Sequence, residues 1–226
     1  MPVRRIPPGR CSLTGWVPAA KAGGLVEFES ALERDFVTLL VFDRAVIGFE
    51  AQPCRIPWTS SDGQARHYIP DFFVQYRRDG ETVEPRCDCL CEVKYRHDLA
   101  TQWRRYKPKF MAARGYARTR GWRFQIITER EIRTPYLDNA RFLLRYRTLP
   151  AHPAGEDRLR KTLIALRRTT PGTLIAVVSP DETGRATLLP SLWKLIEQGQ
   201  IGCNLRQPLT MESPIWLPAG AAEVDR

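Results

Sequence analysis

Apolar residues recur at helical spacing over residues 27–43, and this pattern predicts the first helix of the chain. One stripe of this helix is formed by Phe28, Leu32, Phe36, Leu39 and Leu40. Glu33 lies beside the stripe, so we expect its carboxylate at the margin of a core and not far out in water. The first helix therefore brings an acidic side chain close to the protein interior.

Shorter apolar runs follow, rich in the aromatic and β-branched residues that are typical of strands. Polar turns, TSSDGQ and RRDGET, separate the first three of them. The predicted strands lie within residues 46–58, 67–77, 89–95 and 122–128, and a helical pattern fills residues 98–120 before the last strand. The element order is αβββαβ, which predicts an α/β fold.

A change of pattern after residue 148 indicates a second domain. Residues 149–157 contain two prolines and a glycine and are predicted to be a linker. Residues 158–217 show three helical segments and a short hairpin, a winged-helix-like pattern. The predicted divisions are a flexible basic arm (1–24), an α/β domain (25–148), the linker, a small partner-binding domain (158–217) and a disordered tail (218–226).

The charge balance points to a polyanionic partner, above all nucleic acid. The 226 residues contain 35 Lys and Arg against 25 Asp and Glu, a formal net charge of +10. Residues 94–123 hold ten basic side chains and one acidic one. The arginines and lysines that we expect to contact DNA phosphates are Arg96, Arg104, Arg105, Lys107 and Lys109. The alternative is that these basic side chains form a solvated helix face.

The chain shows no signal peptide and no membrane span, which predicts a cytoplasmic protein with reduced thiols. Three of its six cysteines lie within residues 87–91. Their spacing is not the usual pattern of a structural zinc site, and no good second ligand pair is visible. We therefore interpret them as packing cysteines.

Three charged residues inside two neighbouring apolar segments suggest a site. Asp71 follows Pro70 in one run, and Glu92 and Lys94 end the next. Because strand side chains alternate, Glu92 and Lys94 point to the same face. Charged groups in such positions are costly unless they are paired or bind a metal. The alternative is a structural role, in which Asp71 is a turn carboxylate and Glu92 and Lys94 form an ion pair on one face of the strand.

The chemistry that fits this pattern is metal-dependent hydrolysis of a phosphodiester. Mg²⁺ prefers hard oxygen ligands and takes one or two carboxylates plus water. Asp71 and Glu92 are the expected ligands, assisted by the carbonyl of Val93 and by Glu33, and Mn²⁺ is an expected substitute. Lys94 would orient the attacking water and offset phosphate charge. This is the pattern of the PD-(D/E)xK nucleases.

Longer stretches resemble one family within that superfamily, the TnsA endonucleases. The resemblance covers residues 25–147 and rests on ESALERDFVTLLVFD, FEAQPCRIPW, HYIPDFFV, LCEVKYR and WRFQIITEREI. A weaker one covers residues 158–217. It implies a restriction-endonuclease-like fold in which Glu33, Asp71, Glu92 and Lys94 are the catalytic set. Some members have Gln where this chain has Glu92, and Glu is the more usual nuclease residue.

The resemblance also implies a function in cut-and-paste transposition of the Tn-seven-like kind, including CRISPR-associated elements. A TnsA-like protein cuts the non-transferred strand at the 5′ ends of the element. A DDE transposase, the TnsB-like partner, cuts and joins the 3′ ends, and an AAA+ regulator, TnsC-like, engages the C-terminal domain. Such a protein works in the bacterial cytoplasm, at the nucleoid during transposition, and we expect weak activity in isolation.

Two other functions stay open from the sequence. One is a stand-alone restriction or repair nuclease of the same fold. The other is a catalytically silent DNA-binding or adaptor subunit, against which the four nuclease residue types argue. For residues 158–217 we favour contact with protein over contact with DNA, because LLPSLWKLIEQG carries only Lys194 as a base.

Overall fold

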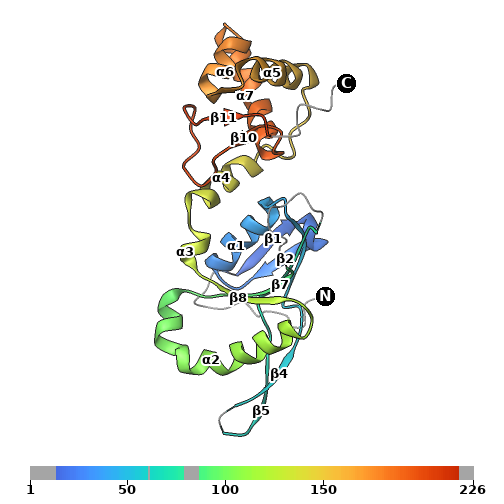
Figure 1. The fold of residues 1–226 in the computed structure, drawn as a ribbon, viewed down its shortest axis with the longest axis vertical. Coiled ribbons are helices and arrows are strands. Elements are labelled where there is room, and N and C mark those ends of the chain that lie inside the picture. The colour runs from blue at the N-terminus through green and yellow to red at the C-terminus, as the bar shows by residue number, and fades with distance from the viewer. Residues whose placement is uncertain (1–13, 61, 79–86, 219–226) are drawn as a thin grey trace. The chain divides into compact units, whose positions relative to one another are not determined.

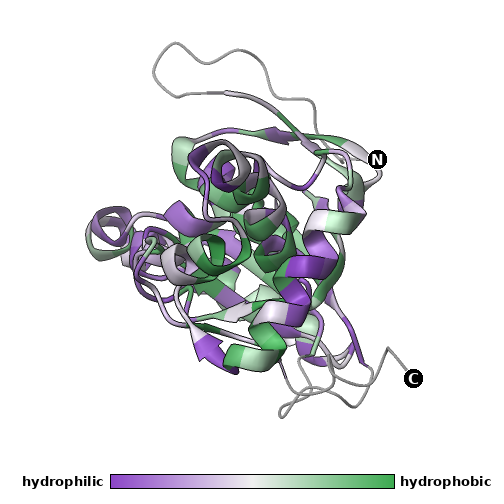
Figure 2. Cartoon of the chain, turned by 90° about the horizontal axis from the view of Figure 1, so that it is seen from above, coloured by the Kyte–Doolittle hydropathy of each residue, from purple (hydrophilic) through white to green (hydrophobic). Residues whose placement is uncertain are grey.

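The computed structural model describes residues 14–60, 62–78 and 87–218. The chain divides into two units, residues 1–133 and 134–226 (Figure 1). Most of the helices carry both hydrophilic and hydrophobic residues along their length (Figure 2). Among the described residues, none of the helices is both long and apolar enough to span a bilayer.

The first unit begins with a hairpin that the sequence did not predict. Strands β1 (Gly15–Ala19) and β2 (Gly24–Phe28) pair antiparallel and are joined by the short 3-10 helix η1 (Ala20–Ala22). Gly23 turns the chain with a φ of 74°, a conformation that favours glycine. The prediction of a flexible arm over residues 1–24 is therefore wrong for residues 15–24, while residues 1–13 lie outside the described part.

Helix α1 (Ala31–Phe42) begins four residues later than predicted, because residues 24–28 pair in β2. Ser30 caps the helix by accepting a hydrogen bond from the backbone N–H of Glu33 at 3.1 Å. The apolar stripe is confirmed, since Leu32, Phe36 and Leu40 are buried.

The central sheet has the strand order β3-β6-β7-β8. Its strands are β3 (Val46–Ala51), β6 (Phe72–Tyr76), β7 (Cys89–Val93) and β8 (Arg123–Ile127). The first three pair antiparallel and β8 pairs parallel to β7. All five residues of β7 are buried, as expected for a strand covered on both faces.

The two faces of the sheet are covered by different helices. Phe72 pairs with Cys91, so their side chains share a face, and Phe36 of α1 packs edge-on against Phe72 at 5.5 Å. The alternate residue Leu90 points the other way and packs with Phe110 of α2 (Arg96–Arg118). Glu92, two residues after Leu90, therefore lies on the α2 face of the sheet.

A second hairpin and α2 build the core beneath this face. Strands β4 (Ile56–Thr59) and β5 (Ala65–Tyr68) pair antiparallel and form a ribbon that extends beyond α2 (Figure 1). Residues 46–58, predicted as one run, are thus split into β3 and β4, with Gln52 at a φ of 51° between them. The buried residues of this core are Ile56, Tyr68, Leu90, Phe110, Ala113 and Ala117. Helix α3 (Glu129–Ile132) ends the unit.

The second unit contains four helices and a small antiparallel sheet within its described residues. The helices are α4 (Pro135–Leu144), α5 (Pro153–Leu166), α6 (Pro171–Val178) and α7 (Glu182–Glu197). Strands β9 (Arg168–Thr169), β10 (Gly202–Cys203) and β11 (Ile215–Trp216) pair in the order β10-β11-β9. Three helices and a hairpin after residue 150 agree with the sequence pattern.

The boundary between the units corrects the predicted domain division. The structure divides the chain after Arg133 and not after residue 148, because α4 packs within the second unit. Phe142 of α4 contacts Trp193 edge-on at 5.2 Å, and Asn139 donates to the carbonyls of Leu205 and Gln207. The predicted linker 149–157 is also partly helical, since α5 begins at Pro153.

Candidate functional site

The carboxylate of Glu92 is the most buried charged group on the α2 face of the sheet, with the residue only 1% exposed. Its Oε2 accepts a hydrogen bond from the Tyr68 hydroxyl at 2.5 Å, and its Oε1 accepts one from Lys109 Nζ at 3.2 Å. Lys94 Nζ lies 3.4 Å from the same Oε1. Each oxygen of this buried carboxylate therefore has a partner, which is the condition for burying a charge.

Asp71 lies on the neighbouring strand segment, directly before β6. Its Oδ2 accepts a hydrogen bond from the backbone N–H of Val93 at 2.7 Å. Its backbone carbonyl accepts one from the N–H of Gln52 at 2.8 Å. These bonds fix Asp71 against the end of β7, beside Glu92.

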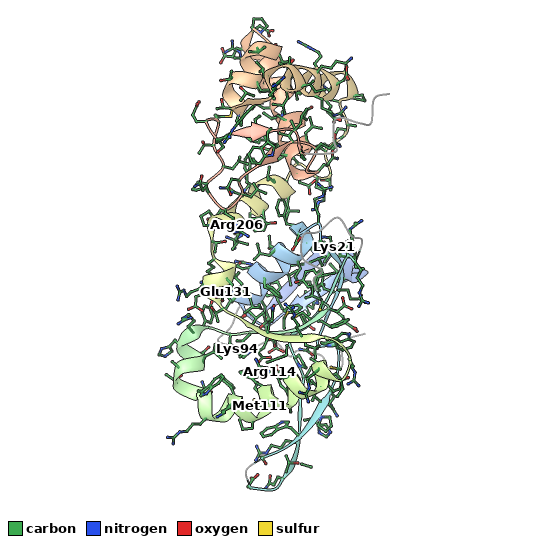
Figure 3. The ribbon with its side chains drawn as sticks, in the orientation of Figure 1. Lys21, Lys94, Met111, Arg114, Glu131 and Arg206 are labelled. Carbon is green, nitrogen blue, oxygen red and sulfur yellow. The ribbon has the colours of Figure 1, made fainter. Side chains whose placement is uncertain are left out.

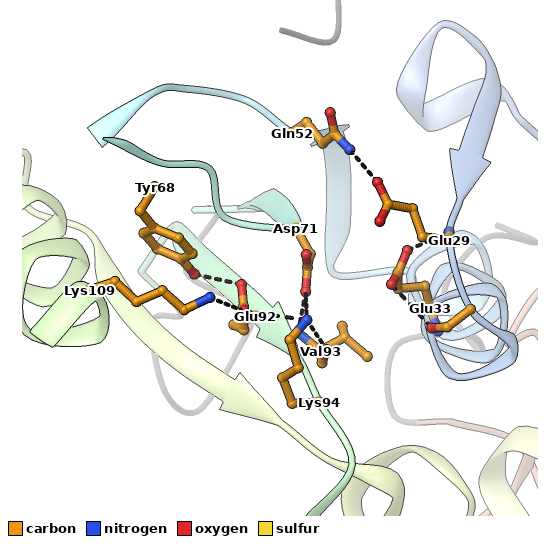
Figure 4. Close-up of polar contacts among 10 residues, drawn as sticks. Glu29, Glu33, Gln52, Tyr68, Asp71, Glu92, Val93, Lys94 and Lys109 are labelled. Atoms are coloured by element: carbon orange, nitrogen blue, oxygen red, sulfur yellow. Dashed lines mark hydrogen bonds and ion pairs between the residues drawn. The ribbon is translucent and has the colours of Figure 1, made fainter. Parts of the chain in front are cut away.

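The ammonium group of Lys94 joins these groups. Lys94 Nζ lies 3.6 Å from Asp71 Oδ2, 3.4 Å from Glu92 Oε1 and 3.1 Å from the Val93 carbonyl oxygen (Figure 4). Figure 3 shows Lys94 above α2, at the level of the sheet. The predicted same-face placement of Glu92 and Lys94 is confirmed, and two carboxylates and one carbonyl converge on a single cation.

Glu33 is held differently. Its Oε2 accepts from the backbone N–H of Glu29 at 2.7 Å and its Oε1 from the Ser30 hydroxyl at 3.1 Å. These are bonds at the start of α1, which packs on the other face of the sheet. The structure thus brings Asp71, Glu92 and Lys94 together, whereas Glu33 stands near them without a hydrogen bond to any of the three.

Electrostatics nevertheless link Glu33 to the cluster. Burial raises the pKa of Glu33, while the charge of Lys94 counteracts part of this shift. Burial and the neighbouring charge of Glu92 raise the pKa of Asp71 well above its usual range. Burial opposes the charged form of Lys94, but the carboxylates of Asp71, Glu92 and Glu33 outweigh it and raise its pKa. The cluster therefore favours a cation at the position of the Lys94 ammonium.

Tyr68 and Lys109 come from the elements beneath the sheet. Tyr68 ends β5 and is 5% exposed, and burial followed by the charge of Glu92 raises the pKa of its hydroxyl. The hydroxyl therefore stays a hydrogen-bond donor. Lys109 lies on α2, with its Nζ 4.6 Å from the centre of the Tyr68 ring.

The predicted phosphate contacts divide into two groups. Arg96, Arg104, Arg105 and Lys107 are exposed on α2. Lys109 is different, because its side chain is only 21% exposed and bonds Glu92. The aromatic residue Phe110 is buried in the core, while Trp103 is 45% exposed.

The donor set of this site fits a hard divalent cation. Three oxygens, from Asp71, Glu92 and the Val93 carbonyl, lie within 3.6 Å of one Nζ. No cluster of three or more His, Cys, Asp or Glu side chains that could hold a metal occurs among the described residues. Two carboxylates and one carbonyl match the donor preference of Mg²⁺, which takes one or two carboxylates and fills its shell with water and other oxygens.

Residues 43–129 match the protein family described as TnsA-like endonuclease N terminal. This segment contains Asp71, Glu92, Lys94 and Lys109. This segment is thus similar to the N-terminal domain of the TnsA-like endonucleases. Its mixed α/β architecture is that of a restriction-endonuclease-like fold. Among curated proteins, none matches the chain.

The TnsA-like domain contains two site residues that the sequence analysis missed or assigned elsewhere. Tyr68 was not singled out, although it stands three residues before Asp71 in an aromatic strand pattern. Lys109 was grouped with the phosphate contacts. The helical spacing could have predicted its position, because Lys109 adjoins the stripe of Tyr106, Phe110 and Ala113 that faces the core.

Proposed function

We propose that this chain is a Mg²⁺-dependent DNA endonuclease that cuts the non-transferred, 5′ strand at transposon ends. The observation that carries the proposal is the convergence of Asp71, Glu92 and the Val93 carbonyl on one cation within a TnsA-like domain. Hydrolysis of a phosphodiester needs charge stabilisation and an activated water, which a bound Mg²⁺ supplies.

Each residue of the cluster has a part in this function. Asp71, Glu92 and the Val93 carbonyl would hold the cation. Lys94 turns its ammonium from the carboxylates toward the scissile phosphate, where it offsets negative charge and orients the attacking water. Glu33 stands within electrostatic reach and stabilises the positive charge of the site from the start of α1.

The exposed basic residues of α2 bind the DNA backbone in this proposal. Arg96, Arg104, Arg105 and Lys107 offer charge without a pattern of base contacts, so they position the duplex but do not select its sequence. Sequence selection then comes from partner subunits, a DDE transposase of the TnsB-like kind and an AAA+ regulator of the TnsC-like kind. The protein works in the bacterial cytoplasm, at the nucleoid during transposition.

The second unit acts as a winged-helix-like domain that binds protein and not DNA. Its third helix after residue 150, α7, is buried over Ser191–Glu197, so this half does not enter a DNA groove. Lys194 is 8% exposed and donates to the carbonyl of Leu149 at 2.8 Å. Lys194, the one base of the buried half Ser191–Glu197, therefore bonds within the fold and does not contact phosphate.

Strand-specific cleavage of a labelled transposon-end duplex in Mg²⁺ tests this function. Wild type and Asp71→Asn are compared with and without the cognate DDE transposase, and Asp138→Asn is the matched control because that carboxylate side chain is 78% exposed. Cutting of the 5′ strand that needs the partner and is lost only in Asp71→Asn supports the proposal. Partner-independent cutting of arbitrary DNA indicates a stand-alone nuclease, and no cutting under any condition indicates a silent adaptor.

A further inference from the structure

The carboxylate of Glu92 is bound from two sides by different parts of the domain. Oε1 faces the ammonium groups of Lys94 and Lys109, at 3.4 and 3.2 Å. Oε2 accepts from the Tyr68 hydroxyl at 2.5 Å. The oxygen that a metal would share with Asp71 is thus distinct from the oxygen that Tyr68 holds (Figure 4).

Tyr68 is itself fixed in place. It pairs with Ile56 across the β4–β5 hairpin, and its ring packs edge-on against Phe110 with 6.2 Å between ring centres. Lys109 Nζ lies over the same ring. A phenol held by a strand partner, an aromatic contact and a cation has little freedom to turn its hydroxyl away from Glu92.

We propose that Tyr68 is a positioning residue for the metal-binding carboxylate, a role that no family assignment gives it here. By occupying Oε2, it fixes the rotation of the Glu92 carboxylate and presents Oε1 toward Asp71 and the Val93 carbonyl. Groups that hydrogen-bond a metal ligand set its orientation, and their loss typically weakens metal affinity or activity by about 10–100-fold. This inference rests on the proposed function, because it assumes that the site takes a divalent cation.

The placement of Tyr68 also joins the catalytic strand to the hairpin. Tyr68 is the last residue of β5, and Arg66 and His67 before it are exposed on the same strand. Glu92 is therefore oriented by an element whose other side chains face outward. A Tyr68 hydroxyl that only stabilised the fold would make the same buried hydrogen bond to Glu92. The test therefore has to separate an effect on metal affinity from an effect on stability.

The test measures Mn²⁺ binding to the full-length chain without DNA, with electron paramagnetic resonance as the readout. Tyr68→Phe removes the hydroxyl oxygen and leaves the ring. The dissociation constant of this variant for Mn²⁺ is expected to rise about 10–100-fold over that of wild type. Tyr106→Phe is the matched control, because its ring also flanks Lys109, at 4.9 Å, while Glu92 receives no bond from it in the described structure. Asp71→Asn defines which Mn²⁺ signal belongs to this site.

Cleavage gives a second readout that a structural role would not produce. Loss at limiting Mg²⁺ is expected in Tyr68→Phe, with recovery as Mg²⁺ is raised, because the defect lies in affinity. Tyr68→Leu, which also removes the hydroxyl but keeps an apolar side chain, is expected to lose affinity similarly and replaces Tyr68→Phe if that variant does not fold. Unchanged Mn²⁺ affinity in the folded variant overturns this inference alone. Wild type without Mn²⁺ binding at the site overturns the proposed function and this inference with it.

Discussion

Replacing Lys94 with Met tests whether its ammonium occupies the place of the metal. The substitution keeps the length of the side chain and removes its charge. At an effective dielectric constant of about 20, an ion pair at 3.4–3.6 Å contributes a gross attraction of about 5 kcal/mol. Breaking a fully buried pair costs about 3–5 kcal/mol. Because Lys94 is a quarter exposed and Glu92 keeps two other donors, we expect the metal-free protein to lose about 1–3 kcal/mol of unfolding free energy.

The same variant is expected to bind metal more tightly while losing cleavage. In wild type the ammonium and the metal compete for Asp71 Oδ2, Glu92 Oε1 and the Val93 carbonyl. Removing the competitor is expected to strengthen Mn²⁺ binding by about tenfold, which is about 1.4 kcal/mol of additional stabilisation by the ion. Affinity and activity therefore move in opposite directions, which a general loss of structure does not produce.

Urea denaturation of Lys94→Met and wild type, in chelator and in a series of Mn²⁺ concentrations, measures both effects. Strand cleavage in Mg²⁺ is measured beside it. Lys161→Met is the control for the loss of one positive charge, because the side chain of Lys161 is 71% exposed on α5. The reasoning is refuted if Lys94→Met binds Mn²⁺ more weakly than wild type, since the ammonium would then support the metal site and not compete for it.

Three further predictions follow from the described contacts. In metal-free protein, Asp71→Asn is expected to gain stability relative to wild type as pH rises above about 4. Above that pH the Asp71 carboxyl ionises in the unfolded chain but resists ionisation in the fold, so wild type loses stability and the variant does not. Equal pH profiles of the two proteins in chemical denaturation would contradict this. Arg104→Ala and Arg105→Ala are each expected to reduce, by about 0.9, the slope of the logarithm of the duplex-binding constant against the logarithm of the salt concentration. An unchanged slope would show that the replaced arginine does not contact a phosphate. Leu143→Ala, at a fully buried position of α4, is expected to cost about 2–5 kcal/mol in the calorimetric transition of the second unit, whereas a loss in the first unit would place α4 on the other side of the boundary.

The grouping of the site residues could be predicted because strand geometry is simple. A period of two places Glu92 and Lys94 on one face, and adjacent strands bring Asp71 beside them. The start of α1 was harder to place, because Phe28 fits the helical stripe and yet pairs in β2. Local pattern does not reveal that Phe28 pairs with Gly15, which lies 13 residues earlier in a segment rich in proline and glycine.

The prediction of the domain boundary was wrong for a related reason. Residues 149–157 have the composition of a linker, but Pro153 occupies the first position of α5, where a helix tolerates proline. Long-range contacts decide the division: Asn139 binds carbonyls more than 60 residues away, and Arg147 pairs with Glu197 at 2.6 Å. Composition carries no information about such partners.

Lys109 shows the same limit within one helix and contributes to the charge balance of the site. Sequence order places it among exposed bases, and only the phase of α2 brings it to Glu92. Lys94 and Lys109 face Asp71 and Glu92, so basic and acidic side chains balance two against two. A divalent cation at these oxygens adds charge that must be offset, and a DNA phosphate is the anion that both ammonium groups can then reach. Metal and DNA are therefore expected to bind cooperatively, and the isolated protein is expected to cut arbitrary DNA only weakly.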